Sequence, residues 1–209
     1  GEAFVSYIRQ PGIWSILAFM LFYRFGEAMV AKMSVLFLKD DLANGGLAFN
    51  NEQIGLIKNT IGLLGIICGG IAGGVVISKL GLKRAFIPIA VAMHLPIALY
   101  WYTATLTGPS VPWVAMVDFI DQFGYGFGYA GYSVYIMRIA QRGNFRTSHY
   151  AIGTGLGQTF ITIAGIISGP IQQKVGWAGF FGFAMLFAIP GLITLFFIKH
   201  DEDLKTAAS

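Results

Sequence analysis

The chain has 209 residues, of which 56% are hydrophobic and only 11% are charged. A typical soluble domain carries about 25% charged residues, so this composition excludes a water-soluble globule and indicates a protein embedded in a lipid bilayer. The formal net charge is +4, but the basic residues fall in short clusters between apolar stretches. We therefore expect no nucleic-acid partner.

Six apolar stretches are long enough to cross a membrane. They cover about residues 13–38, 54–77, 85–106, 111–137, 147–173 and 178–198. A helix needs about 20 residues to cross the hydrocarbon core, and in lipid the backbone groups of each stretch must be paired internally. We therefore predict an all-α fold in which residues 1–209 form one six-helix transmembrane bundle.

The basic residues between these stretches predict how the chain crosses the membrane. Lysine and arginine favour the cytoplasmic side, and most of them fall in connections that would share one side. They are Arg9, Lys79, Lys83, Arg84, Arg138, Arg142, Arg146, Lys199 and Lys205. Only Lys39 and Lys174 fall on the other side, so we predict that both termini are cytoplasmic and that residues 39–53 form an outer loop.

The first stretch carries Arg24, Glu27 and Lys32 within its apolar sequence. A charged side chain near the bilayer centre costs about 2.5 to 3.5 kcal/mol, so such residues normally face a partner or a polar pathway. Arg24 and Glu27 are three positions apart and would share a helix face. We expect them to form a fixed ion pair. Purely structural ion pairs among the embedded charges are the alternative to a role in transport.

The second stretch has Lys58 and Asn59 in its outer part, followed by Gly65, Gly69 and Gly73. Small residues spaced by four let helix backbones approach closely, and the same spacing recurs at residues 124/128 and 153/157. We predict close helix packing at these glycines. They do not form a phosphate-binding loop, because no strand precedes them and no Lys-Ser/Thr pair follows in register.

The fourth stretch contains a continuous polar stripe. Its members, spaced mostly by three or four, are Asp118, Asp121, Gln122, Tyr125, Tyr129 and Tyr132. Water or a polar ligand would satisfy such a stripe, and packing of the last two tyrosines against other helices is the alternative. We predict that Asp121 carries a coupling proton, because it lies about ten residues, or ~15 Å, from the outer end. Asp118 and Glu27 are the alternatives.

The fifth stretch adds a short polar stripe of Thr154, Gln158 and Thr162, and Gln158 is the residue most able to reach a ligand. Enzyme chemistry is not indicated, because the histidines are not spaced as metal ligands and no serine or cysteine has a matching base nearby. A charged stretch, a glycine-rich stretch and a largely uncharged stretch follow one another twice. This order predicts two inverted three-helix repeats, although chance could also produce it.

The connection between the second and third stretches resembles the loop signature of the major facilitator superfamily, G-x-x-x-D-R-x-G-R-K/R-R. The sequence GVVISKLGLKR at residues 74–84 carries this resemblance, with serine where the signature has aspartate. The resemblance implies that this loop takes part in conformational change. The matching residues are Gly74, Ser78, Lys79, Gly81, Lys83 and Arg84.

A broader resemblance is to the anhydromuropeptide permease family (AmpG-type). It is carried by YRFGEA at residues 23–28, KNTIGLL at 58–64, Gly-Pro at 169–170, Gly-Trp at 176–177 and Pro-Gly at 190–191. It implies a twelve-helix proton-driven importer in a bacterial inner membrane, of which this chain is the C-terminal six-helix half. The implied solute is an N-acetylglucosaminyl anhydro-muramoyl unit with or without peptide. The implied partners are the N-terminal six-helix half, the lipid bilayer, the solute and protons, and no cofactor is implied.

The predicted solute-binding residues are Arg24, Lys32, Lys58, Asn59, Gln122, Tyr125 and Gln158. Three of them are cations at membrane depth, which favours an anionic group on the solute. A transporter of the same superfamily for another solute, such as a sugar, peptide or acyl-nucleotide, shares all of these features. A membrane enzyme for lipid-linked substrates and a self-sufficient six-helix homodimer are the remaining alternatives.

Overall fold

In the computed structural model, residues 1–142 and 144–197 are described, and helices joined by short connections account for most of them. The predicted all-α fold is confirmed. The elements are α1 (Glu2–Ile8), α2 (Ile13–Phe22), α3 (Phe25–Lys39), the 3-10 turn η1 (Leu42–Asn44), α4 (Asn51–Gly55), the π-helix η2 (Leu56–Gly62), α5 (Leu63–Leu80), α6 (Leu82–His94), α7 (Pro96–Thr105), α8 (Val111–Ala140) and α9 (Arg146–Thr194). The predicted end of the last stretch, with Lys199 and Lys205, lies outside the described residues.

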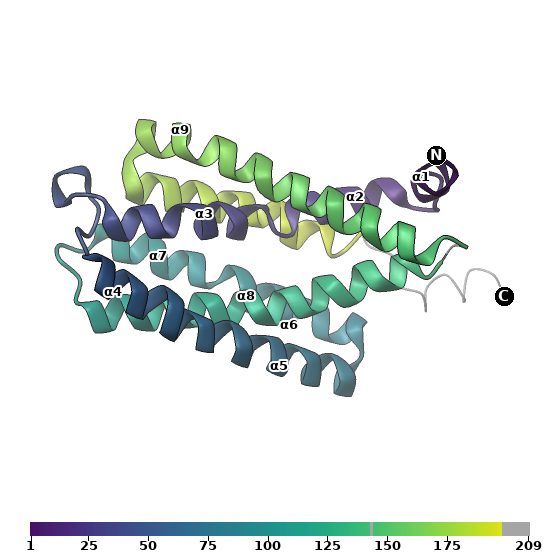
Figure 1. Ribbon diagram of the computed structural model, residues 1–209, viewed down its shortest axis with the longest axis horizontal. Helices are drawn as coiled ribbons and strands as arrows, with labels where there is room; N and C mark the ends of the chain where they lie inside the picture. Colours follow the sequence, from purple (N-terminus) through teal and green to yellow (C-terminus); the bar gives the residue numbers. More distant parts are fainter. Residues whose placement is uncertain (143, 198–209) are drawn as a thin grey trace.

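Within the described residues, four helical stretches are long and apolar enough to cross a membrane. They are Ile13–Lys39, Asn51–Leu80, Leu82–Thr105 and Arg146–Thr194. The 30-residue helix α8 is also long enough, but its polar stripe makes it less apolar. The stretch predicted at 147–173 and most of the one predicted at 178–198 lie in α9, which ends at Thr194 and leaves helical geometry at Gly176 (φ 71°), where it folds back (Figure 1).

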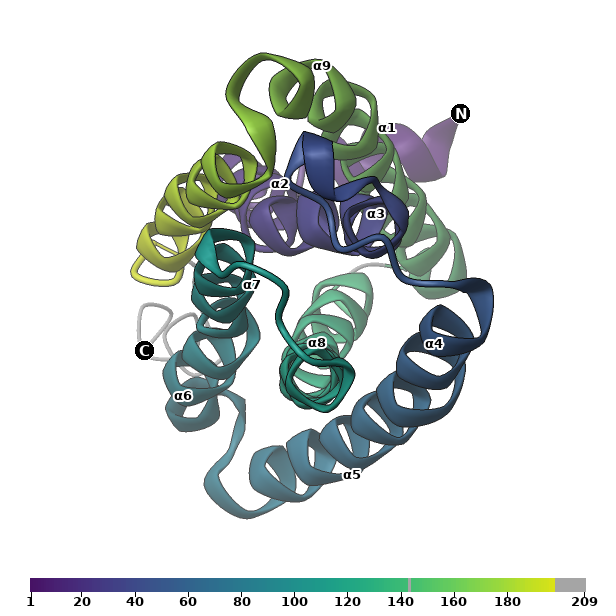
Figure 2. The same ribbon diagram turned by 90° about the vertical axis from the view of Figure 1, so that its left-hand side faces the viewer.

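The central helix of the bundle is α8, with α5 packed along one side of it (Figure 2). A methyl group at Gly65 would lie 2.7 Å from the carbonyl oxygen of Phe119, and one at Gly73 would lie 2.8 Å from that of Phe127. Only glycine permits this approach of the two backbones. The prediction of close packing at the second stretch is therefore confirmed, and this packing brings η2 against the polar part of α8.

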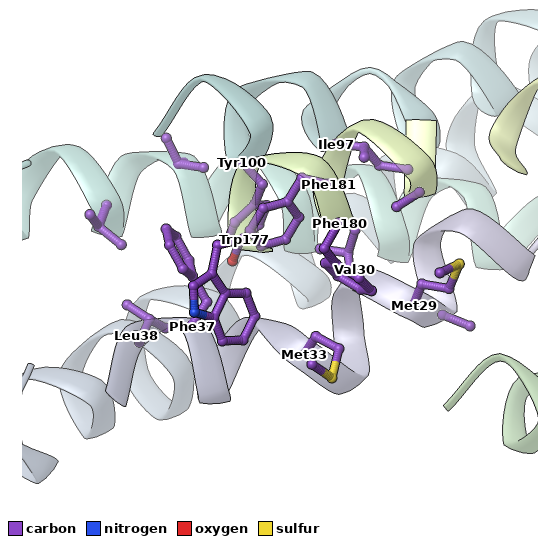
Figure 3. Close-up of a cluster of buried hydrophobic side chains, with 14 of the residues drawn as sticks. Met29, Val30, Met33, Phe37, Leu38, Ile97, Tyr100, Trp177, Phe180 and Phe181 are labelled. Atoms are coloured by element: carbon purple, nitrogen blue, oxygen red, sulfur yellow. The ribbon is translucent and has the colours of Figure 1, made fainter. Parts of the chain in front are cut away.

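A cluster of large buried side chains fills the end of the bundle at which α3 and α7 finish (Figure 3). The rings of Phe37, Tyr100 and Trp177 all lie close to Phe181 of the second arm of α9, with centroid distances of 5.1, 5.3 and 6.2 Å. The indole Nε1 of Trp177 donates to Oδ2 of Asp40 at 2.8 Å. The end of α3 is thereby fixed to the start of the second arm of α9.

The loop that resembles the superfamily signature is very short. Gly81 alone separates α5 from α6, and its φ of 75° favours glycine. Ser78 donates its hydroxyl proton to the carbonyl oxygen of Val75 at 2.8 Å, within its own helix. The predicted conformational role of this loop remains a prediction.

Candidate solute and proton site

Three elements bring polar side chains together against α8. Lys58 of η2 forms an ion pair with Asp118 of α8, and its amine also donates to Ser34 Oγ of α3 at 2.8 Å. The hydroxyl of Tyr100, from α7, donates to the same carboxyl oxygen of Asp118 at 2.6 Å. Asp118 is fully buried and Lys58 is 14% exposed. Because removing one partner would leave a buried charge without compensation, these residues form one interdependent group.

The backbone around Lys58 has an unusual geometry and lies close to α8. Residues Leu56–Gly62 form a π-helix, a rare geometry that often occurs at functional sites. At its end, a methyl group on Gly62 would lie only 2.5 Å from Oδ2 of Asp118. Glycine at this position therefore lets the Asp118 carboxylate lie directly against η2.

Arg24 is the second buried cation, and it lies against the tyrosines of the polar stripe. Its guanidinium donates to the hydroxyl of Tyr125 at 3.0 Å. The guanidinium carbon is 5.0 to 5.5 Å from the ring centroids of Tyr125, Tyr129 and Tyr132, within the range of cation–π attraction. Tyr129 remains 44% exposed, so this arrangement is a half-open aromatic surface around one arginine.

The expected ion pair between Arg24 and Glu27 is wrong: both residues are described, and no ion pair joins them. The physical reason is that α3 begins at Phe25, so Arg24 lies before the helix with φ −106° and ψ 0°. The three-residue spacing places two side chains on one face only when both belong to the same helix. Outside the helix, Arg24 points to the tyrosines instead.

Two buried carboxyl groups therefore lack a cation in direct contact. Glu27 and Asp121 are each 2% exposed, and one oxygen of each makes no hydrogen bond to any described residue. The other oxygen of Asp121 accepts from Gln122 Nε2 at 3.2 Å. A buried carboxylate without such compensation is costly, so a proton is a natural partner for either group.

The remaining predicted solute-binding residues lie on exposed faces. Asn59 is exposed on η2, Lys32 is exposed on α3 beside Gly165 of α9, and Gln158 is exposed on the first arm of α9. The hydroxyl of Thr162 bonds to the backbone of its own helix, at the carbonyl of Gln158. These side chains do not converge with Lys58 or Arg24 among the described residues, and their solute-binding role remains a prediction.

Ser34 and Tyr100 belong to the site but were not predicted. Both are neutral and lie in stretches where polar side chains usually bond within the protein, so spacing alone gave no signal. The one available indication was that a buried lysine needs acceptors besides its carboxylate. The described residues contain no group of three or more histidine, cysteine, aspartate or glutamate side chains placed to hold a metal ion.

The chain is similar in sequence to several known proteins. No family model matches the chain. It is 25% identical over 198 residues to a protein named anhydromuropeptide permease from Escherichia coli K12, covering 95% of this chain and 39% of that protein. It is 24% identical over 202 residues to a protein named putative transporter AmpG 4 from Rickettsia felis, covering 96% and 47%. An uncharacterized protein from Haemophilus influenzae is 25% identical over 214 residues, covering 97% and 49%.

These relatives confirm the resemblance found in the sequence. The matches cover nearly all of this chain, whereas the chain spans about two-fifths to one-half of each relative's length. The relatives whose names state a function are called permeases or transporters. This agrees with a helical protein that has helices long and apolar enough to cross a membrane.

Proposed function

We propose that this chain, a homologue of anhydromuropeptide permeases, is half of a proton-coupled transporter that imports a muropeptide across a bacterial inner membrane. The observation that carries the proposal is the buried polar group around Lys58 and Asp118, together with Arg24 on its tyrosine surface. Embedded charges of this kind normally mark a solute or proton pathway. The permease name of the Escherichia coli relative supports the choice of solute.

In the proposed architecture the chain crosses the membrane six times as two inverted triplets. The two arms of α9 supply the last two crossings, and α8 supplies the fourth. The stretches Asn51–Leu80 and Arg146–Thr194 are the least buried of the four apolar stretches. These two stretches would receive the N-terminal half of the transporter, with both termini in the cytoplasm.

In the proposed site Arg24 binds the anionic part of the solute. An arginine offers planar donors that suit a carboxylate, and the adjacent tyrosine rings offer faces on which a sugar can stack. Lys58 is held by Asp118, Ser34 and Tyr100, so its charge is shared within the protein. Arg24 is therefore the cation that remains available to a peptide carboxylate or a lactyl group.

In the proposed coupling step Asp121 binds and releases the driving proton. Asp118 is committed to Lys58, whereas Asp121 has an oxygen without a hydrogen bond to the described residues. Glu27 shares that property, so it becomes the first alternative to Asp121. A carrier residue must alternate between a dry and a wet surrounding, and a carboxyl group inside a closing bundle meets that requirement.

The solute site is tested by uptake of a radiolabelled N-acetylglucosaminyl anhydro-muramoyl tripeptide in cells that express the complete protein. Arg24→Gln should raise the apparent KM at least tenfold, because a charge-assisted contact is lost. Arg9→Gln, which removes an exposed arginine outside the site, should leave KM unchanged. Wild-type KM in Arg24→Gln at equal expression would remove Arg24 from the site.

The proton role is tested with the complete protein in proteoliposomes. Asp121→Asn should abolish accumulation driven by a pH gradient and keep gradient-free counterflow, because only coupling needs a titrating group. Glu52→Gln removes an exposed carboxylate of α4 and should leave both activities intact. If Asp121→Asn still accumulates solute in response to the gradient, the proton carrier is another group, and Glu27→Gln is then measured in the same way.

A further inference from the structure

Two interruptions in the helices that are long enough to cross a membrane lie next to each other, close to Arg24. The first separates α2 from α3 at Tyr23 and Arg24, and the second separates α6 from α7 at Leu95. Pro96 begins α7 and has no backbone N–H, which accounts for the second break. Carbonyl groups at such breaks lose their normal helical donors and need other partners.

His94 connects the two breaks. It is the last residue of α6 and is 6% exposed. Its Nε2 lies 2.8 Å from the carbonyl oxygen of Tyr23, and its Nδ1 lies 2.8 Å from that of Ala90. Because a carbonyl oxygen only accepts, the contact with Tyr23 is a hydrogen bond when Nε2 carries a proton. The imidazole thus supplies the donor that the break in the first membrane helix lacks.

The backbone that His94 holds is directly bonded to the proposed solute-binding residue. Tyr23 immediately precedes Arg24, and the hydroxyl of Tyr23 donates to the carbonyl of Gly128 in α8 at 3.3 Å. From the other side, a methyl group on Gly191 of α9 would lie 2.6 Å from the carbonyl oxygen of Phe22. The break is therefore fixed by three helices, and His94 is the contact that acts on the Tyr23 backbone through a side-chain hydrogen bond.

The geometry points to His94 as a positioning residue: its Nε2–H bond to Tyr23 holds the helix break so that the Arg24 guanidinium stays over the tyrosines and meets the solute. This inference rests on the proposed role of Arg24. Besides this bond, the His94 ring packs edge-on against the Tyr23 ring, with centroids 5.7 Å apart, so both contacts act on Arg24 through the neighbouring Tyr23. Loss of the bond frees the Tyr23 carbonyl and lets the Arg24 side chain leave its place.

The test compares three variants of the complete protein by uptake of the labelled muropeptide. His94→Leu removes the donor at similar volume and should raise the apparent KM at least tenfold with little change in maximal rate. His94→Gln keeps an N–H close to the position of Nε2 and should restore KM to within about threefold of wild type. His149→Gln, at a buried histidine bonded to Gln10 outside the site, should leave KM unchanged.

A double-variant cycle shows whether His94 acts through Arg24. In an Arg24→Gln background, His94→Leu should cause no further rise in KM, because the side chain that it positions is absent. An additive rise would overturn the positioning role. If Arg24→Gln raises KM while His94→Leu does not, the inference fails and the proposed site stands. If Arg24→Gln itself has no effect, both fail.

A measurement independent of transport completes the test, and it also serves if His94→Leu does not fold. The ¹⁵N spectrum of histidine-labelled complete protein in bilayers, with His94 assigned by its absence in His94→Gln, reports the protonation of each ring nitrogen. The inference requires a proton on Nε2. A lone pair on Nε2 would contradict it, because the ring proton would then sit on Nδ1, toward the carbonyl of Ala90, and Tyr23 would receive no hydrogen bond from His94.

Discussion

Replacing Lys58 with methionine should destabilise the bundle far more than the loss of one surface charge. Asp118 is fully buried, and its ion pair with Lys58 would be removed, leaving the Tyr100 hydroxyl as its remaining donor. Breaking a buried ion pair costs about 3 to 5 kcal/mol. A domain of 150–250 residues loses about 2 to 4 °C of melting temperature per kcal/mol, so the expected drop is about 6 to 20 °C for a unit the size of this chain and less where a larger unit unfolds as one.

The assay is the melting temperature of the purified complete protein in one detergent, for a full double-variant cycle. Lys58→Met with Asp118→Asn removes both charges and should recover most of the loss, because no uncompensated charge remains. Lys32→Met, an exposed lysine of α3, should change the melting temperature little. If Lys58→Met and the double variant melt at the same reduced temperature, the ion pair does not account for the stability and the reasoning is refuted.

Two further predictions concern packing and pH. Gly69→Ala should lower the melting temperature by several degrees, because its methyl group would overlap the backbone of α8. In the control variant Gly70→Ala the methyl group meets open space, so the melting temperature should not change. Equal effects of the two variants would contradict the packing of α5 against α8. Hydrogen bonds from Asn44 and then Trp177 lower the pKa of Asp40 below 3.8. The ionised Asp40 side chain therefore stabilises the folded protein. This stabilisation is complete at a pH above the ordinary pKa of aspartate and is lost as the pH falls through the lower folded-state pKa. The melting-temperature difference between wild type and Asp40→Asn should therefore shrink below pH 3.8, and a constant difference would contradict this.

Apolar length and small-residue spacing were enough to predict much of the fold. Stretches of about 20 apolar residues must be helical in lipid, and the glycines at 65, 69 and 73 predicted close helix packing because only small side chains allow it. The partner helix, α8, comes from the structure. Repeat symmetry and membrane orientation are set by the surroundings of the chain as well as by its sequence. They therefore remain proposals.

The site was only partly predictable, because side-chain partners depend on tertiary packing. The polar stripe of α8 was visible as a three-to-four residue spacing, and its tyrosines do lie against Arg24. The break before α3 has no clear sequence signal, so the pairing of Arg24 with Glu27 was wrongly expected. Likewise no sequence signal indicated the π-helix that presents Lys58, and the bonds that the Lys58 amine donates to Ser34 and Tyr100 depend on the approach of separate elements.

The most direct test of the central claim is uptake by the complete protein reconstituted in proteoliposomes with an imposed pH gradient, alkaline inside. A radiolabelled N-acetylglucosaminyl anhydro-muramoyl tripeptide should accumulate inside, and excess unlabelled muropeptide should compete while a free sugar, a tripeptide and an acyl-nucleotide should not. Accumulation should stop when a protonophore collapses the gradient. Failure of active, correctly inserted protein to take up the muropeptide, with uptake of one of the other three solutes instead, would contradict the account.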